Sequence, residues 1–72
     1  MRVNKNPVYL ITLTFYDDLT GRQNTRRTVR DTEEAARASA RNLLQYYREL
    51  PRVSDVDLII QEMAPAGKTI LY

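Results

Sequence analysis

Residues 8–16 read VYLITLTFY, and this stretch decides the fold because it is the most apolar strand that the chain offers. β-Branched and aromatic residues favour an extended backbone, and alternate side chains of a strand point to opposite faces. One face therefore carries Tyr9, Ile11, Leu13 and Phe15. We expect this strand to lie at the centre of a sheet, with that face against the core.

Residues 17–21, DDLTG, follow as a turn in which Gly21 supplies a positive φ. Residues 22–30 then form the second strand of a hairpin. A three-residue loop pairs Leu13 with Arg27 and Ile11 with Val29. This register turns Arg27 toward the core side, where a charged side chain fits only by reaching past the rim or if the loop differs by one residue.

A helix is predicted from residue 31 to about residue 50. Asp31 is a suitable N-cap, and Glu34 three residues later completes a capping box. Pro51 disfavours helical geometry at the residue before it and so ends the helix. One apolar stripe at helical spacing is expected to face the sheet: Ala36, Ala40, Leu43, Tyr47 and Leu50.

Residues 53–63 and 68–72 form a second hairpin, joined by a turn at residues 64–67. Its register pairs Ile60 with Tyr72. The order is ββαββ, and a right-handed crossover gives a four-stranded antiparallel sheet in the order 2-1-3-4. The predicted class is therefore α+β, with one helix on one face of the sheet. Residues 1–72 make a single domain, in which residues 1–7 are an N-terminal extension.

This register divides the strand residues between two faces. The side toward the helix takes Tyr9, Ile11, Leu13, Phe15, Val29, Val56, Leu58, Ile60, Ile70 and Tyr72. The open side takes Leu10, Thr12, Thr14, Tyr16, Arg22, Arg26, Thr28, Arg30, Ile59, Gln61, Met63, Thr69 and Leu71.

The charged residues indicate a binding protein. The chain has nine arginines and two lysines but a net charge of only +2, so the distribution of charge matters more than its sum. Arginine makes two-pronged contacts to carboxylate or phosphate and stacks on aromatic rings. Without histidine or cysteine, no disulfide, metal site or cofactor is expected. No secretory signal or membrane span is evident, so a cytoplasmic protein is expected.

Two surfaces are candidates for binding a partner. The first is the open face of the sheet, because an apolar patch rimmed by polar groups often marks an interaction site. Its predicted contact residues are Tyr16, Arg22, Arg26, Arg30, Ile59, Met63 and Leu71. The second is a basic stripe on the helix, formed by Arg37, Arg41 and Arg48. The alternatives are a half-solvated sheet, self-association through the open face, and a solvated helix face with a Glu33–Arg37 pair.

Catalysis is not predicted. The paired carboxylates, Asp17 with Asp18 and Asp55 with Asp57, fall at the ends of elements and outside any obvious cleft. The glycine-lysine-threonine run at residues 67–69 lacks the upstream glycine and the following helix of a phosphate-binding loop. The Tyr46-Tyr47 pair suggests base stacking, although Tyr47 is better placed for the core.

Two resemblances suggest partners. In size and ββαββ layout, residues 8–72 resemble the small accessory proteins of phages and mobile elements, including anti-CRISPR proteins. This resemblance implies an inhibitor or adaptor that docks on a protein or protein–nucleic acid complex. Residues 20–22 (TGR), the basic strand through Arg26 and Arg27, and the helix start DTEEA at 31–35 resemble the arm-type DNA-binding domain of tyrosine integrases. That resemblance covers about residues 8–44 and implies DNA contacts by Arg22, Arg26 and Arg30. We favour the inhibitor or adaptor, with DNA binding as the alternative.

Overall fold

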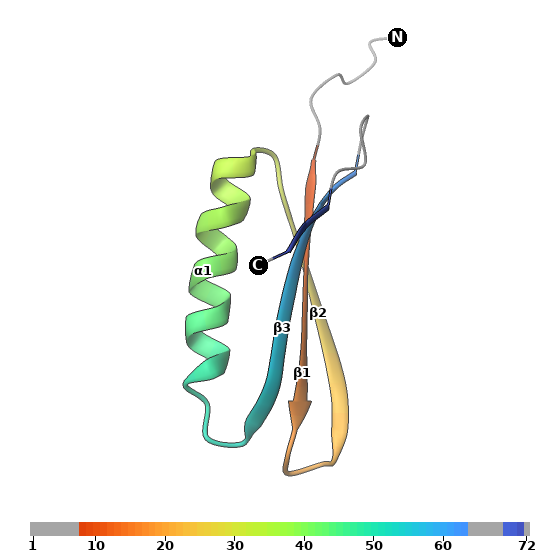
Figure 1. Cartoon of the computed structure of the whole chain (residues 1–72), viewed down its shortest axis with the longest axis vertical. Helices are drawn as coiled ribbons and strands as arrows, with labels where there is room; N and C mark the ends of the chain where they lie inside the picture. The colour runs from red at the N-terminus through yellow and green to blue at the C-terminus, as the bar shows by residue number, and fades with distance from the viewer. Residues whose placement is uncertain (1–7, 64–68, 72) are drawn as a thin grey trace, which may run out of the picture.

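The computed structural model describes residues 8–63 and 69–71. It is an α+β protein in which one helix lies along one side of an antiparallel sheet (Figure 1). The elements, in chain order, are β1 (Tyr9–Asp17), β2 (Arg22–Arg30), α1 (Glu33–Arg48), β3 (Val53–Glu62) and β4 (Thr69–Leu71). The predicted extension at residues 1–7 and the predicted turn at residues 64–67 lie outside the described residues.

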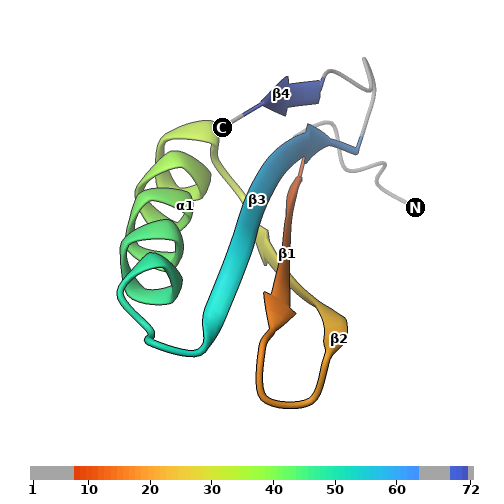
Figure 2. The ribbon, with the colours of Figure 1, turned by 60° about the horizontal axis from the view of Figure 1, so that its bottom comes forward.

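The sheet differs from the four-stranded layer that the sequence predicted. The helix packs on a three-stranded antiparallel layer, β2-β1-β3, whose strands are nine or ten residues long. β4 has three residues, follows β3 in the strand order, and pairs only with residues 59–61 (Figure 2). Ile60 pairs with Ile70, whereas the sequence predicted Tyr72. β4 is therefore a short addition to the end of β3 and not an equal member of the layer.

The register of the first hairpin corrects the prediction by one residue. Leu13 lies opposite Arg26, where the sequence predicted Arg27, and Ile11 lies opposite Thr28. Since successive side chains of a strand alternate between faces, this single step moves every side chain of β2 to the other face. Arg27 consequently lies on the open side, and the misfit that the predicted register created disappears.

The cause of the shift is a longer turn. Asp17 pairs with Arg22, so four residues, 18–21, connect the strands instead of three. The Asp17 side chain accepts hydrogen bonds from the backbone N–H groups of Leu19 and Thr20, at 2.9 and 3.4 Å. The Gly21 N–H donates to the Asp17 carbonyl at 2.8 Å, with Gly21 in the left-handed region at φ 69°. An aspartate that bonds the backbone after it stabilises a turn of this kind.

The core lies between α1 and the centre of the sheet. Among the residues whose burial the structure describes, eight hydrophobic ones are buried: Tyr9, Ile11, Leu13, Ala36, Ala40, Leu44, Leu58 and Ile60. The predicted face of β1 and the two alanines of the helix stripe are confirmed, since Ala36 and Ala40 have no exposed surface. Leu44 takes a buried place, while Leu50 lies beyond the end of the helix, which stops at Arg48. Small residues in the first two turns bring that end of α1 close to the sheet.

The start of the helix also corrects the prediction. Thr32, and not Asp31, is the N-cap: its Oγ1 accepts a hydrogen bond from the Ala35 N–H at 3.1 Å. The predicted capping box fails, because the residue three positions after Thr32 is an alanine. Glu33 and Glu34 still place negative charge at the positive end of the helix dipole.

We expect Thr32→Ala to lower the free energy of unfolding by about 1 kcal/mol, because the substitution leaves a helix N–H without its side-chain acceptor. Asp31→Ala is the matched control and should change it by no more than about 0.5 kcal/mol. Urea unfolding followed by circular dichroism measures both. A larger loss from Asp31→Ala would restore Asp31 as the cap.

β3 contains an irregularity beside the turn. Thr14 pairs with Asp57 and Tyr16 pairs with Ser54, so one residue of β1 faces two residues of β3. This β-bulge includes Asp55, which adopts a left-handed conformation at φ 51°. Aspartate tolerates that region better than most non-glycine residues. The bulge allows Val56 and Leu58 to face the helix while Asp57 lies on the open side.

Candidate binding surface

The arginines predicted to bind a partner share one face of β2, but it is the face toward the helix. Arg22, Arg26 and Arg30 alternate with Asn24 and Thr28 along this side of the strand. Neighbouring arginines are four residues apart, which corresponds to about 13 Å along a strand. The helix lies mainly over β3 and β1. The row therefore remains exposed beside the helix and not beneath it.

Two of the three guanidinium groups are held by the helix. Arg26 Nη1 donates a hydrogen bond to the Tyr47 hydroxyl at 3.1 Å, and Arg30 Nε donates to Ser39 Oγ at 2.9 Å. Arg30 Nη1 also donates to the carbonyl of Val29 at 2.8 Å. These acceptors are neutral, so they orient the guanidinium groups and leave their charge uncompensated. The hydrogen bond to Tyr47 raises the pKa of Arg26 above its ordinary value, which keeps the group charged.

Aromatic rings continue this surface onto α1. Tyr47 packs on Phe15 with a ring-centroid distance of 4.8 Å. Tyr46 meets Tyr47 edge-on at 5.2 Å and is 59% exposed. We name the set Arg22, Arg26, Arg30, Ser39, Tyr46 and Tyr47 the arginine–tyrosine surface. It joins three cations, two of them held by the helix, to an accessible aromatic ring.

The row forms no ion pair within residues 8–63, although Asp17 lies opposite Arg22 at the end of the hairpin. The only carboxylate ion pair described there joins Arg37 to Glu33 at 2.9 Å, one helical turn apart. Because a guanidinium group with a free planar edge can bind a carboxylate or phosphate in a two-pronged manner, the arginine–tyrosine surface is suited to an anionic partner.

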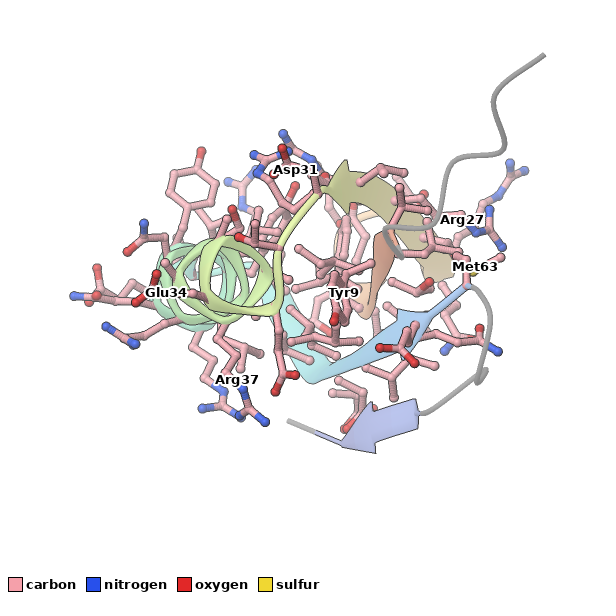
Figure 3. All side chains as sticks on the ribbon, turned by 90° about the horizontal axis from the view of Figure 1, so that it is seen from above. Tyr9, Arg27, Asp31, Glu34, Arg37 and Met63 are labelled. Atoms are coloured by element: carbon pink, nitrogen blue, oxygen red, sulfur yellow. The ribbon has the colours of Figure 1, made fainter. Side chains whose placement is uncertain are left out.

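The other predicted contact residues lie on the opposite side of the sheet. Tyr16, Ile59 and Met63 are on the open face, with Tyr16 38% and Met63 49% exposed. Leu71 belongs to β4, and its side chain lies outside the described part of the chain. The structure thus divides the predicted site into two separate surfaces. The arginine among the described residues of the open face is Arg27, which points away from the helix (Figure 3).

The predicted basic stripe on the helix is also modified by the structure. Arg37 is engaged with Glu33, while Arg41 and Arg48 line a shallow hollow of about 470 Å³ together with Leu44, Gln45 and Glu49. Leu44, between Arg41 and Arg48 in the sequence, is 6% exposed and belongs to the core. The hollow therefore has two cations, Arg41 and Arg48, but no aromatic residue among the described residues that line it, whereas Arg26 on β2 contacts Tyr47.

Asp17, Asp18 and Glu62 have structural contacts. Asp17 holds the turn, and Asp18 Oδ1 accepts a hydrogen bond from Ser54 Oγ at 2.9 Å. Glu62 accepts a hydrogen bond from the Tyr9 hydroxyl at 3.1 Å, and burial together with this bond raises the pKa of Tyr9. Among residues 8–63 and 69–71, no group of acidic side chains is arranged to hold a metal ion.

Ser39 is the contact that sequence reasoning missed. A serine on an amphipathic helix carries no signal of its own, and its bond to Arg30 follows only from the corrected register. Comparison of the chain with protein families, curated proteins and solved structures finds no match. Within the described residues, α1 is neither long nor apolar enough to cross a membrane.

Proposed function

We propose that the chain is a small non-enzymatic binding protein, an inhibitor or adaptor, that docks the arginine–tyrosine surface on an acidic region of a larger protein. The observation that carries the proposal is the row Arg22, Arg26 and Arg30, whose cations form no ion pair among the described residues, although Asp17 lies opposite Arg22. Such charges make long-range attraction to an anionic surface favourable and guide the orientation of docking.

The composition of the surface supports a protein partner. Arginine and tyrosine are enriched among the residues whose truncation weakens protein interfaces most. Arg26 and Arg30 are already oriented by Tyr47 and Ser39, so less side-chain freedom is lost when they bind. The phage-type accessory role suggested by the architecture is part of this proposal.

Nucleic acid is the second candidate, because a nine-residue basic strand with an exposed tyrosine beside it also suits a phosphate backbone. The two candidates differ in their response to salt. Binding that neutralises several phosphates weakens steeply as the salt concentration rises, whereas a protein interface with aromatic contacts weakens less.

The test compares two double variants that change the net charge equally. Arg26→Glu/Arg30→Glu removes the row, and Arg41→Glu/Arg48→Glu changes the helix and serves as control. We expect the affinity of the strand variant for its partner to fall by about a hundredfold or more, because truncating hot-spot residues weakens protein interfaces by this much. The control should retain most of the binding.

The measurement is quantitative affinity capture from cells of the source organism, after circular dichroism and melting show that both variants are folded. Fluorescent single-stranded and duplex DNA of mixed sequence are titrated in parallel at two salt concentrations. Loss of capture by the helix variant alone would contradict the proposed surface. Tight DNA binding by the parent that the strand variant loses would support the second candidate instead.

A further inference from the structure

On the open face of the sheet, directly paired residues of β2, β1 and β3 form five rows across the strands, which we call levels. No described element covers it, because α1 lies on the opposite side (Figures 1 and 3). Direct partners in the register share a face, so the levels follow from the pairing. From the N-terminal end of β1 onward they are Val8 with Met63; Leu10 with Val29 and Gln61; Thr12 with Arg27 and Ile59; Thr14 with Thr25 and Asp57; and Tyr16 with Gln23 and Ser54.

The apolar residues of this face gather at one end. Val29 is 55% exposed and Met63 is 49% exposed, and Leu10 lies between their strands on β1. The other end carries mainly polar residues, with Thr14, Thr25 and Gln23 beside Tyr16, which is 38% exposed. An apolar cluster with a polar continuation is typical of an interface that is covered in use.

The face also carries two opposite charges in a particular arrangement. Arg27 lies on β2 and Asp57 lies on β3, so β1 separates them, and they are one level apart along the strands. Both are exposed, and neither forms an ion pair or a side-chain hydrogen bond within the described part of the chain. Each charge therefore lacks a partner among the residues that the structure describes.

We propose that a second copy of the chain covers this face, related by a two-fold axis that runs parallel to β1. This operation places β2 of one copy over β3 of the other. Arg27 then lies one level from Asp57 of the second copy, within reach across the roughly 10 Å that separates packed sheets. The symmetry repeats the contact, so two ion pairs flank the centre. It also brings the two apolar ends together, Leu10 against Leu10.

The alternative face-to-face arrangement is unfavourable. A two-fold axis perpendicular to the strands places β2 over β2, which brings Arg27 close to its own copy. It also sets the apolar end around Leu10 against the polar end around Tyr16. Like charges that face each other at an interface are costly, so the charge pattern selects the first arrangement.

The size of the face predicts a weak dimer. Three strands of about nine residues cover roughly 400 Å², since strands lie about 4.8 Å apart and rise about 3.3 Å per residue. A stable interface buries about 800 Å² on each partner. We therefore expect association to depend on concentration, with a dissociation constant in the high micromolar range. The arginine–tyrosine surface lies on the other side and stays accessible in both copies.

Two single variants and their mixture test the proposal. Arg27→Asp and Asp57→Arg each place like charges opposite each other in the dimer, so sedimentation equilibrium should show each variant dimerising at least about tenfold more weakly than the parent. An equimolar mixture of the two restores both opposite-charge pairs and should dimerise nearly as well as the parent. Arg41→Asp makes the same change of charge on an exposed residue of the helix, away from this face; it is the matched control and should leave association unchanged.

Recovery in the mixture shows that both variants are folded and that the two charges meet between copies. If the parent stayed monomeric up to millimolar concentration, the proposal would be overturned, and the open face would have to bind a different partner. Association that neither charge variant weakens, or that the mixture does not restore, would overturn the proposed arrangement as well.

Discussion

Ile11→Ala should bring the protein close to unfolding at ordinary temperature. Ile11 lies at the centre of β1 with no exposed surface, between β2 and β3 and beneath α1. Removing a large aliphatic side chain from such a site costs about 2–5 kcal/mol, because the neighbours cannot fill the cavity fully. A domain of this size has about 4–11 kcal/mol of stability in total. The substitution therefore removes a large fraction of it.

Urea unfolding followed by circular dichroism gives the free energy of unfolding of the parent and of the Ile11→Ala variant. Leu19→Ala is the control, because Leu19 is 68% exposed in the turn and its truncation should change the free energy by no more than about 0.5 kcal/mol. Equal losses from the two variants would show that Ile11 is not at the centre of the core.

Ala40→Leu should destabilise the protein by about 1–3 kcal/mol, because the added side chain has no space between the helix and the sheet. Ala40 has no exposed surface and lies on the part of α1 where small residues allow close approach. A methyl group fits there, whereas three more carbons force the helix away from β1 and β3.

Ala38→Leu makes the same chemical change on the exposed side of the same helix. It should leave the melting temperature nearly unchanged, since leucine and alanine have similar helix propensities. If Ala38→Leu lowered the melting temperature as much as Ala40→Leu, the destabilisation would arise from helix formation and not from packing.

Sequence reasoning succeeded where the hydrophobic pattern is strong. The alternation of β1 assigned Tyr9, Ile11 and Leu13 to the core side, and helical spacing did the same for Ala36 and Ala40. These assignments depend only on the period of each element, which the residues themselves reveal.

The register of β2 could not be obtained in the same way. Its sequence, RQNTRRTVR, has no alternation of apolar and polar residues, so either face is equally compatible with the core side. The assignment then depended on the length of the turn, where one residue separates a three-residue loop from the observed loop of four. The sequence correctly placed Arg22, Arg26 and Arg30 on one face but chose the wrong face. Their role in binding remains a prediction.

The bulge at Asp55 has a consequence for solubility. Within the described residues, β4 pairs only with residues 59–61, so the outer edge of β3 from Val53 to Leu58 has no neighbouring strand. A straight, unpaired edge is a template on which other chains add and aggregate. The bulge and the left-handed Asp55 bend this edge and place a charge on it, while arginines occupy the edge formed by β2. Both long edges of the sheet therefore carry features that oppose the addition of further strands.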